Sequence, residues 1–392
     1  MRMNGILSFI LVMLLSTVLF AGVGDANVIG TGDTIQFCHN AQNTGDHVSI
    51  AQTSASNGQL SRSYTTKGAV YSSPIVSDGI VYVGSYDHNV YALNAATGAK
   101  VWNYTTGSHV YSSPTVANGI VYVGSNDYNV YALNAATGAK VWNYTTKGAV
   151  SYSWPAIANG IVYVGSYDHN VYALNAATGA KVWSYDTGSV VYYSPIVGNG
   201  IVYVGSYDYN VYALNAATGA KVWSYTTLGP VIRRPAFANG IVYVASDDHS
   251  VYALDANTGA KVWSYDTGDL MSSPTVANGI VYVGSNDHNV YALNAATGAK
   301  VWNYTTKGVI WSAPGIANGI VYVGSWDNNV YALNATTGAK VWSYAIDNIV
   351  YTTTAIGNGI VYVGGGSGVI YALNATTGAK VWNYDTGGPV SD

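Results

Sequence analysis

The sequence predicts an all-β protein that folds as an eight-bladed β-propeller, a ring of four-stranded antiparallel blades of about 40 residues each. Its composition favours strands, because the 392 residues include 36 Tyr and no Glu, and β-branched and aromatic residues suit a pleated surface. A phrase that reads VYALNAATGAKVWNY at residues 90–104 recurs eight times with little change. Each unit also contains GIVYVGS or a close variant, which is apolar on both faces and needs cover on both sides.

The period of the repeat is measured between the tryptophans of this phrase. Successive tryptophans are 40, 41, 40, 40, 39, 40 and 40 residues apart, and a fixed period of this size indicates a repeat architecture. A buried Trp removes about 200 Å² from water, roughly 5 kcal/mol as an upper figure, so each blade interface would receive the same anchor. The predicted structural docking residues are Trp102, Trp142, Trp183, Trp223, Trp263, Trp302, Trp342 and Trp382.

Each unit is expected to contain four strands joined by short turns. In the second unit we expect strands at 109–116, 119–125, 129–134 and 140–145. The segments between them, ANG, SNDY and AATGA, are rich in turn-forming residues. A ring of such sheets covers both faces of every blade, which favours a closed propeller; an open superhelical solenoid is the alternative.

The two ends of the repeat region determine how the ring closes. Residues 60–66 align with the fourth strand of the repeat but carry Arg62 in place of the tryptophan, and the chain stops where a ninth unit would begin. One fourth strand is therefore in excess. We expect the Trp382 strand to keep its place because its motif is intact; the alternatives are that residues 60–66 add beside it or replace it.

The N-terminus has the pattern of a secretory signal. Arg2 is followed by an apolar stretch at residues 6–20 and then by small residues as far as Ala26. We therefore expect an exported protein with an extracellular or cell-surface location, and an uncleaved membrane anchor is the alternative to cleavage. The expected domains are a signal peptide or N-terminal anchor (1–26), a segment leading into the ring (27–59) and the propeller (60–392).

Charge and cysteine content exclude several classes of function. The net charge is −4, and eight lysines fall at one position of the repeat, so no basic face for nucleic acid is expected. Cys38 is the single cysteine, which excludes an internal disulfide. Four histidines share one turn position in different blades, so no metal site is expected. Seven Asp occupy one turn, where a short carboxylate caps its own backbone: Asp87, Asp127, Asp168, Asp208, Asp248, Asp287 and Asp327.

The motif Ala92-x-Asn94-x-x-Thr97-Gly98-x-x-x-Trp102 resembles the tryptophan-docking repeat of the pyrroloquinoline quinone (PQQ)-like propellers. The resemblance recurs eight times over about residues 60–390, and QFCHNAQNTG (36–45) looks like the upstream segment of secreted archaeal and bacterial members. It implies an eight-bladed propeller. Seven units have Asn at the third motif position, where the family prefers the Asp that only one unit carries.

The resemblance alone does not imply an enzyme. The family's quinoprotein dehydrogenases hold PQQ and calcium over the ring axis with a Glu ligand, a catalytic Asp, two adjacent cysteines and a Trp. This chain has no Glu and one cysteine, so we expect no cofactor and no catalysis. A PQQ-dependent oxidoreductase with an atypical site is one alternative, and an envelope-assembly or structural surface protein, as in another branch of the family, is a second.

Differences among the eight units predict where a ligand binds. The first-to-second and third-to-fourth turns hardly change, whereas the second-to-third turns and the openings of the first strands vary. Because antiparallel strands alternate in direction, the variable segments should meet on one face, around the axial mouth. Neutral drift after duplication is the alternative. The candidate ligand-binding residues are Trp154, Tyr192, Arg233, Arg234, Asp247, Asp248, Trp311 and Trp326.

Arg233 and Arg234 depart most sharply from the repeat, because no other unit has a charge at their position. They are expected either to form a local ion pair with Asp247 and Asp248 or to bind an anion or carboxylate. The sequence therefore predicts a non-catalytic, secreted or cell-surface binding or scaffold module. Its ligand would be a protein or a carbohydrate, with no nucleic acid, no membrane contact beyond an N-terminal anchor, and a monomeric state.

Overall fold

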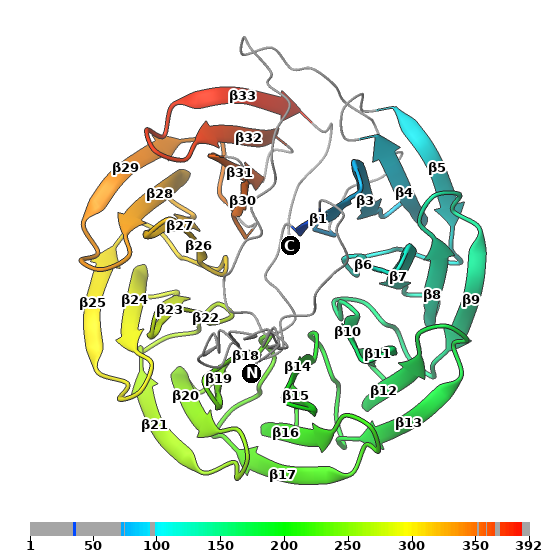
Figure 1. Cartoon of the computed structure of the whole chain (residues 1–392). Helices are drawn as coiled ribbons and strands as arrows, with labels where there is room; N and C mark the ends of the chain where they lie inside the picture. Colours follow the sequence, from blue (N-terminus) through cyan, green and yellow to red (C-terminus); the bar gives the residue numbers. More distant parts are fainter. Residues whose placement is uncertain are drawn as a thin grey trace, which may run out of the picture.

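The computed structural model describes residues 34–36, 72–73, 75–94, 99–350, 353–357, 359–364 and 369–385. These residues form an eight-bladed β-propeller, in which eight antiparallel sheets surround a central axis (Figure 1), as the sequence predicts. They include no helix, and hence none long and apolar enough to cross a membrane. The predicted signal, most of the leading segment, Cys38 and residues 60–66 lie outside the described residues.

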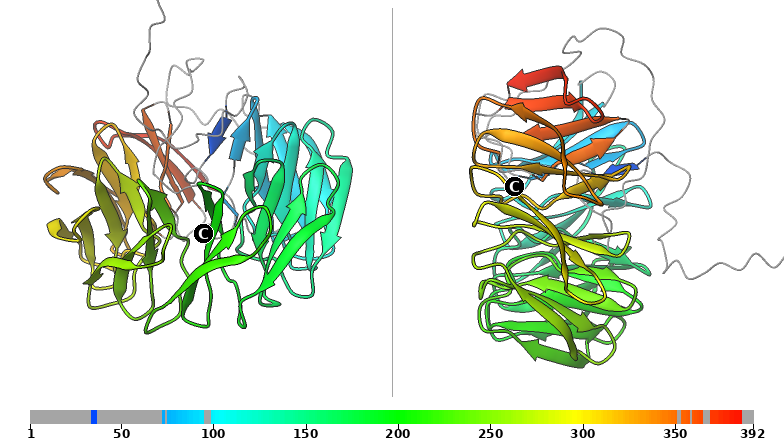
Figure 2. Two further views of the ribbon diagram at one scale, coloured as in Figure 1. Left: turned by 60° about the horizontal axis from the view of Figure 1, so that its bottom comes forward. Right: turned by 90° about the vertical axis from the view of Figure 1, so that its left-hand side faces the viewer.

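Each blade runs from an inner strand at the axis to an outer strand at the rim (Figure 1), and two turned views show the blades standing side by side around the ring (Figure 2). Blades 1 to 8 are β2–β5, β6–β9, β10–β13, β14–β17, β18–β21, β22–β25, β26–β29 and β30–β33. The inner strands are β2 (Ile75–Ser77), β6 (Thr115–Ala117), β10 (Ala156–Ala158), β14 (Ile196–Gly198), β18 (Ala236–Ala238), β22 (Thr275–Ala277), β26 (Gly315–Ala317) and β30 (Ala355–Gly357). The second strands are β3 (Ile80–Gly84), β7 (Ile120–Gly124), β11 (Ile161–Gly165), β15 (Ile201–Gly205), β19 (Ile241–Ala245), β23 (Ile280–Gly284), β27 (Ile320–Gly324) and β31 (Ile360–Gly364).

The third and outer strands carry the repeated phrase. The third strands are β4 (Asn89–Asn94), β8 (Asn129–Asn134), β12 (Asn170–Asn175), β16 (Asn210–Asn215), β20 (Ser250–Asp255), β24 (Asn289–Asn294), β28 (Asn329–Asn334) and β32 (Val369–Asn374). The outer strands are β5 (Lys100–Thr105), β9 (Lys140–Thr145), β13 (Lys181–Asp186), β17 (Lys221–Thr226), β21 (Lys261–Asp266), β25 (Lys300–Thr305), β29 (Lys340–Ala345) and β33 (Lys380–Asp385). Since β33 is the outer strand of blade 8, the Trp382 strand keeps its place. A fifth strand, β1 (Thr34–Gln36), pairs antiparallel with β2 at the axial edge of blade 1.

The inner strand is shorter than the sequence predicts. In blade 2 it spans Thr115–Ala117 instead of 109–116, and the expectation for its first six residues is wrong. Pro114 lacks a backbone N–H, so the ladder cannot extend through it. The side chain of Ser112 substitutes for ladder bonds: its Oγ accepts a hydrogen bond from the Gly124 N–H (3.1 Å) and donates one to the Ser153 carbonyl (3.0 Å). Residues 109–114 therefore run between blades instead of along one.

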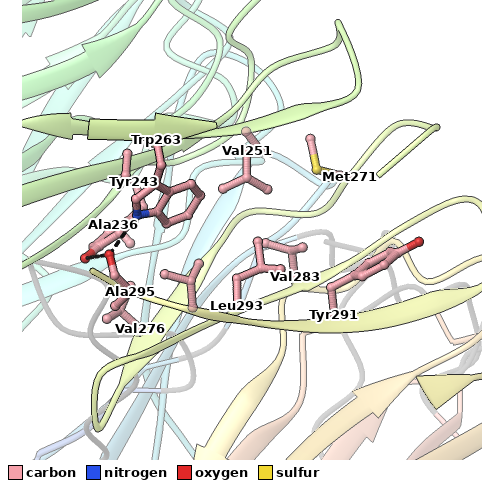
Figure 3. Close-up of a cluster of buried hydrophobic side chains, with 13 residues drawn as sticks. Ala236, Tyr243, Val251, Trp263, Met271, Val276, Val283, Tyr291, Leu293 and Ala295 are labelled. Atoms are coloured by element: carbon pink, nitrogen blue, oxygen red, sulfur yellow. Dashed lines mark hydrogen bonds between the residues drawn. The ribbon is translucent and has the colours of Figure 1, made fainter. Parts of the chain in front are cut away.

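A tryptophan–carbonyl contact joins neighbouring blades at the seven interfaces whose tryptophan side chain is described. Between blades 5 and 6, Trp263 Nε1 donates to the Ala295 carbonyl at 2.9 Å, and the Tyr243 hydroxyl donates to the same oxygen at 3.1 Å (Figure 3). The Trp263 ring also lies flat against Gly298 of blade 6. Six more interfaces repeat the bond: Trp102–Ala135, Trp142–Ala176, Trp183–Ala216, Trp223–Ala256, Trp302–Ala335 and Trp342–Ala375. The Trp382 side chain lies outside the described residues.

The two kinds of turn lie on opposite faces of the ring. In blade 2 the Ala135 N–H donates to the Gly119 carbonyl (2.9 Å), which joins the two turns with little sequence variation on what we call the invariant face. The Thr146 N–H donates to the Tyr128 carbonyl (2.7 Å), which joins the second-to-third turn to the connection leading into the next blade. These segments form the variable face.

We predict that Gly138→Ala destabilises the ring more than Gly119→Ala does. Both glycines have φ of +71°, so both substitutions cost about 1 kcal/mol of backbone strain. A Cβ on Gly138 would lie 2.6 Å from Trp102 Cδ2, whereas a Cβ on Gly119 meets nothing within 4 Å. Overpacking should add about 2 kcal/mol for Gly138→Ala. Urea denaturation measures both values, and equal losses would show that the Trp102 contact does not limit the interface.

We also predict that the ring loses stability in alkali as its buried tyrosines ionise. Burial raises the pKa of Tyr243 to about 12. A folded-state pKa above the unfolded value of about 10 gives stability that is fully present below pH 10 and lost as pH rises towards 12. Melting temperature and tyrosinate absorbance should change together across this range. A melting temperature that is constant to pH 12 would contradict the prediction. Burial also raises the pKa to about 12 at four other tyrosines, Tyr82, Tyr163, Tyr282 and Tyr322.

Candidate binding site on the variable face

The turn aspartates of the variable face are committed to the fold. Asp327 Oδ1 accepts the Asn329 N–H (3.0 Å), and its Oδ2 accepts the Tyr331 hydroxyl (2.7 Å) and the N–H of Lys307 in the preceding connection (2.9 Å). Burial alone would raise the pKa of Asp327, but these donors outweigh it and the pKa is lowered. Asp248 accepts the corresponding bonds, from Ser250, Tyr252 and Leu228. Asp248 is therefore a turn cap and not a free ligand-binding carboxylate.

A row of stacked tyrosines crosses blades 2 to 4 on this face. Tyr152 stacks with Tyr111 (ring centroids 5.3 Å apart, interplanar angle 22°) and with Tyr192 (5.1 Å, 9°). Tyr167 stacks on Tyr192 in turn, at 5.4 Å. The predicted site residue Tyr192 of blade 4 thus belongs to a stack whose other members come from blades 2 and 3.

Arg233 lies at the axial end of blade 5, where most other blades have a serine. Its side chain is 8% exposed, and its Nε donates to the Met271 carbonyl of blade 6 at 2.8 Å. Its guanidinium carbon lies 5.7 Å from the ring centroid of Trp311 in blade 7, and Trp311 contacts Trp326 at 5.5 Å. Arg233 therefore reaches past blade 6 to Trp311, which in turn contacts Trp326.

Arg234 points the other way. Its guanidinium carbon lies 5.5 Å from the ring of Trp154 in blade 3, so it reaches past blade 4. Arg234 is 7% exposed, and a desolvated cation over an indole face is a favourable contact. The two adjacent arginines thus join blades 3, 5 and 7 through aromatic rings. We call Arg233, Arg234, Trp154, Trp311 and Trp326 the axial cluster.

The predicted ion pair with Arg233 is not formed as a direct contact. Within the described part of the chain, no carboxylate oxygen lies within 4.0 Å of its guanidinium nitrogens. Asp247 interacts with it at longer range: burial raises the pKa of Asp247, while the charges of Arg233 and His249 lower it and that of Asp248 raises it, with a net rise. Arg233 and Asp247 therefore interact only through their charges and not by direct contact. Asp248 does not pair with Arg233, because its oxygens accept hydrogen bonds from Ser250, Tyr252 and Leu228.

Sequence reasoning missed several residues of this face. Tyr152 and Tyr167 complete the tyrosine stack, and Tyr207, Tyr209 and Leu228 are exposed by 47%, 45% and 86%. Leu228 had a signal in the sequence, because the described connections between the other blades have Gly, Lys or Asp at its position. The tyrosines did not, because tyrosine also fills buried positions throughout the repeat.

The axial cluster does not fit a quinone held by calcium. Among the described residues no three His, Cys, Asp or Glu side chains come together to hold a metal ion. The indole faces of Trp154 and Trp311, which a planar quinone would stack on, are instead opposed by the two guanidinium groups. No catalytic step through such a group can be derived from these residues.

Comparison with known proteins gives one family and several similar structures. A family model, PQQ_2, described as outer membrane protein assembly factor BamB, matches residues 41–153, 147–235, 228–310 and 305–392. BamB from Moraxella catarrhalis has 20% identity and a TM-score of 0.61 over 76% of this chain and 92% of its own. A europium-containing methanol dehydrogenase has 16% identity and a TM-score of 0.66 over 80% and 84%.

A computationally designed protein, Ika8, has 19% identity and a TM-score of 0.68 over 81% of this chain and 97% of its own. At these identities the structural likenesses show the propeller fold alone. No curated protein matches the chain in sequence.

We predict a measurable coupling between Arg234 and Trp154. Trp154→Ser and Arg234→Ser both restore the serine that other blades have at this position, as in Ser194. A double-mutant cycle on the free energy of unfolding should give a coupling of about 1 kcal/mol, because the cation–π contact is buried. As a control, Arg234→Ser with Trp311→Tyr should be additive. A coupling indistinguishable from the control would mean that the contact contributes nothing to stability.

Proposed function

The chain belongs to the PQQ_2 family described as outer membrane protein assembly factor BamB, and from this premise we propose that it is a non-catalytic protein-binding module. Its ligand would be a protein of the cell envelope or surface, bound on the variable face, and the chain itself would be exported. The family's description as an outer membrane protein assembly factor supports a protein ligand.

One observation carries the proposal: exposed aromatic side chains collect on the variable face. Apart from valines of the outer strands, the exposed large hydrophobic residues in the described part of the chain all lie in the second-to-third turns or the connections between blades. Aromatic residues that are exposed together mark interaction surfaces, since such a surface costs free energy in water until a partner covers it. These residues are Tyr86, Tyr128, Tyr207, Tyr209, Leu228 and Trp311.

The tyrosine stack favours a protein over a carbohydrate as the ligand. A sugar ring binds against the free face of an aromatic ring, but Tyr152 has Tyr111 and Tyr192 stacked with it. What such a row offers a ligand is ring edges and hydroxyl groups. Those suit the mixed polar and apolar surface of a protein, for which tyrosine is a common contact residue.

Two alternative functions have some support. A PQQ-dependent oxidoreductase with an atypical site is favoured by the structural likeness to a methanol dehydrogenase, and opposed by the poor fit of the axial cluster. A structural surface protein is favoured by the rows of exposed outer-strand valines, such as Val101 and Val222, which could pack against a neighbouring molecule.

Selection of phage-displayed peptides tests the proposal. We expect peptides selected on the wild-type ring to bind about tenfold more weakly to the triple variant Tyr86→Asn, Tyr207→Asn, Trp326→Asn, because interface aromatics contribute most of such affinity. Asn126 and Asn286 occupy the same turn position, so the fold accepts this residue. The matched control, Ala136→Lys with Ala217→Lys, changes exposed residues of the invariant face and should leave affinity unchanged.

Either of two results would contradict the proposal. The first is that no selected peptide distinguishes the triple variant from the control variant. The second is saturable binding of PQQ in the presence of Ca²⁺, seen in the cofactor absorbance together with a raised melting temperature. That result would favour the oxidoreductase.

A further inference from the structure

Blade 5 and the connection that enters it collect substitutions found in no other unit. Because all eight units belong to one chain, each unit serves as a reference for the others. Some of these substitutions are on the surface and others are in the interior, so surface drift alone does not describe them. They are Leu228, Arg233, Arg234, Phe237, Ala245, Asp247, Ser250, Asp255 and Asn257.

The interior changes are coupled to one another. At the position of Ala245 the other blades have glycine, and at Gly205 a Cβ would lie 2.5 Å from Val231 Cγ1 of the next blade. Blade 6 accommodates the Ala245 methyl: its unit is one residue shorter, and Met271 packs in the same core cluster as Ala245. The carbonyl of that Met271 is the acceptor for Arg233 Nε. These changes lie next to one another in space, and the Met271 backbone in the altered core holds the Arg233 side chain.

Arg233 has hydrogen-bond donors beyond the one that it uses in the fold. A guanidinium has five N–H groups, of which Nε–H is used by Met271. No hydrogen bond joins the Nη atoms of Arg233 to the described residues, and the side chain is 8% exposed. Asp247, whose charge interacts with Arg233, is itself disfavoured as an anion by burial. A carboxylate from outside fits this fork bidentately.

Three exposed apolar side chains, Tyr207, Tyr209 and Leu228, lie on the turn and the connection that precede Arg233. The Thr227 N–H donates to the Tyr209 carbonyl (2.8 Å), which holds Leu228 beside the turn that contains Tyr207 and Tyr209. Three residues on, the Val231 N–H donates to the carbonyl of Ser206 in the same turn (3.1 Å), and Arg233 follows. Leu228 and Arg233 therefore lie on one connection, which two backbone hydrogen bonds hold against the turn of Tyr207 and Tyr209.

We propose that this surface, the connection 227–233 with the turn 206–209, is the docking site for an extended segment of the protein partner. Arg233 binds a carboxylate of that segment, and Leu228, Tyr207 and Tyr209 cover its neighbouring apolar side chains. The charge of Arg233 and these three apolar side chains define the occupant, an acidic residue close to apolar residues. This inference rests on the proposed protein-binding function and names the chemistry of its ligand.

The repeat supplies variants that test the site without disturbing the fold. Leu228→Lys introduces lysine, which two other connections already have at the equivalent position, as Lys147 and Lys307. At all three positions the backbone N–H donates to a turn aspartate. Arg233→Ser restores the serine of blades such as blade 2. The matched control is Lys307→Leu, which exposes a leucine on a different connection.

The test uses the phage-selected peptides as fluorescent probes in anisotropy titrations. We expect the peptides to contain Asp or Glu beside apolar residues, and both Leu228→Lys and Arg233→Ser to weaken binding about tenfold. Lys307→Leu should have no effect. Replacing the acidic residue of a peptide by its amide should weaken binding to the wild type and not to Arg233→Ser. If C-terminal amidation of the peptide has this effect instead, the bound carboxylate is the chain terminus, which also supports the site.

Other outcomes overturn the inference. If the peptides lose affinity for the triple turn variant but bind Leu228→Lys and Arg233→Ser normally, the protein-binding function stands and this docking site is wrong. If the selected peptides contain no carboxylate, Arg233 is not part of the interface. If no selected peptide loses affinity when the variable face is changed, the proposed function is wrong. This inference is then wrong as well.

Discussion

The hydrogen bond from a repeat tryptophan to a carbonyl of the next blade, present at seven interfaces of the described residues, is the contact on which the ring depends. At the interface of blades 5 and 6, one buried oxygen of Ala295 receives both Trp263 and Tyr243, and the indole leaves room only for the hydrogen of Gly298. A buried carbonyl without any donor costs about 1–3 kcal/mol, and the tryptophan and the tyrosine together keep this oxygen satisfied. The turns of the invariant face are therefore constant because they carry the interfaces.

The same constraint explains why chemistry gathers on the other face. The second-to-third turns lie at the opposite end of the strands from the tryptophan contact, and their fixed element is the aspartate cap. In blade 8, which lacks that aspartate, the Tyr371 hydroxyl donates instead to Asp347 of the preceding connection, at 2.7 Å. The tyrosine hydroxyl of blade 8 thus keeps a carboxylate acceptor, which a different segment supplies. The turn carboxylates of this face are thus committed to the fold, and its variation is carried by the aromatic residues and arginines.

Much of the fold could be predicted from the sequence because the repeat gives period, turns and buried face together. The third and outer strands of blade 2, Asn129–Asn134 and Lys140–Thr145, have their expected bounds. The inner strand was overestimated, because Pro114 and the Ser112 side chain end the ladder before it reaches residues 109–113. The contact of Arg234 with Trp154 could not be foreseen: the residues lie two blades apart, and their only signal was departure from the repeat.

Departure from a repeat has two possible origins, and the interior of the ring separates them. Neutral drift changes residues one at a time, so it should avoid positions where a methyl group would strike the next blade. Ala245 is such a position, and its methyl is accommodated by a shortened unit and by Met271, an unbranched side chain that adapts to irregular space. Because the Met271 backbone then anchors Arg233, the altered core and the altered surface form one structural unit. Drift does not account for that correlation, whereas selection for a specialised blade 5 does.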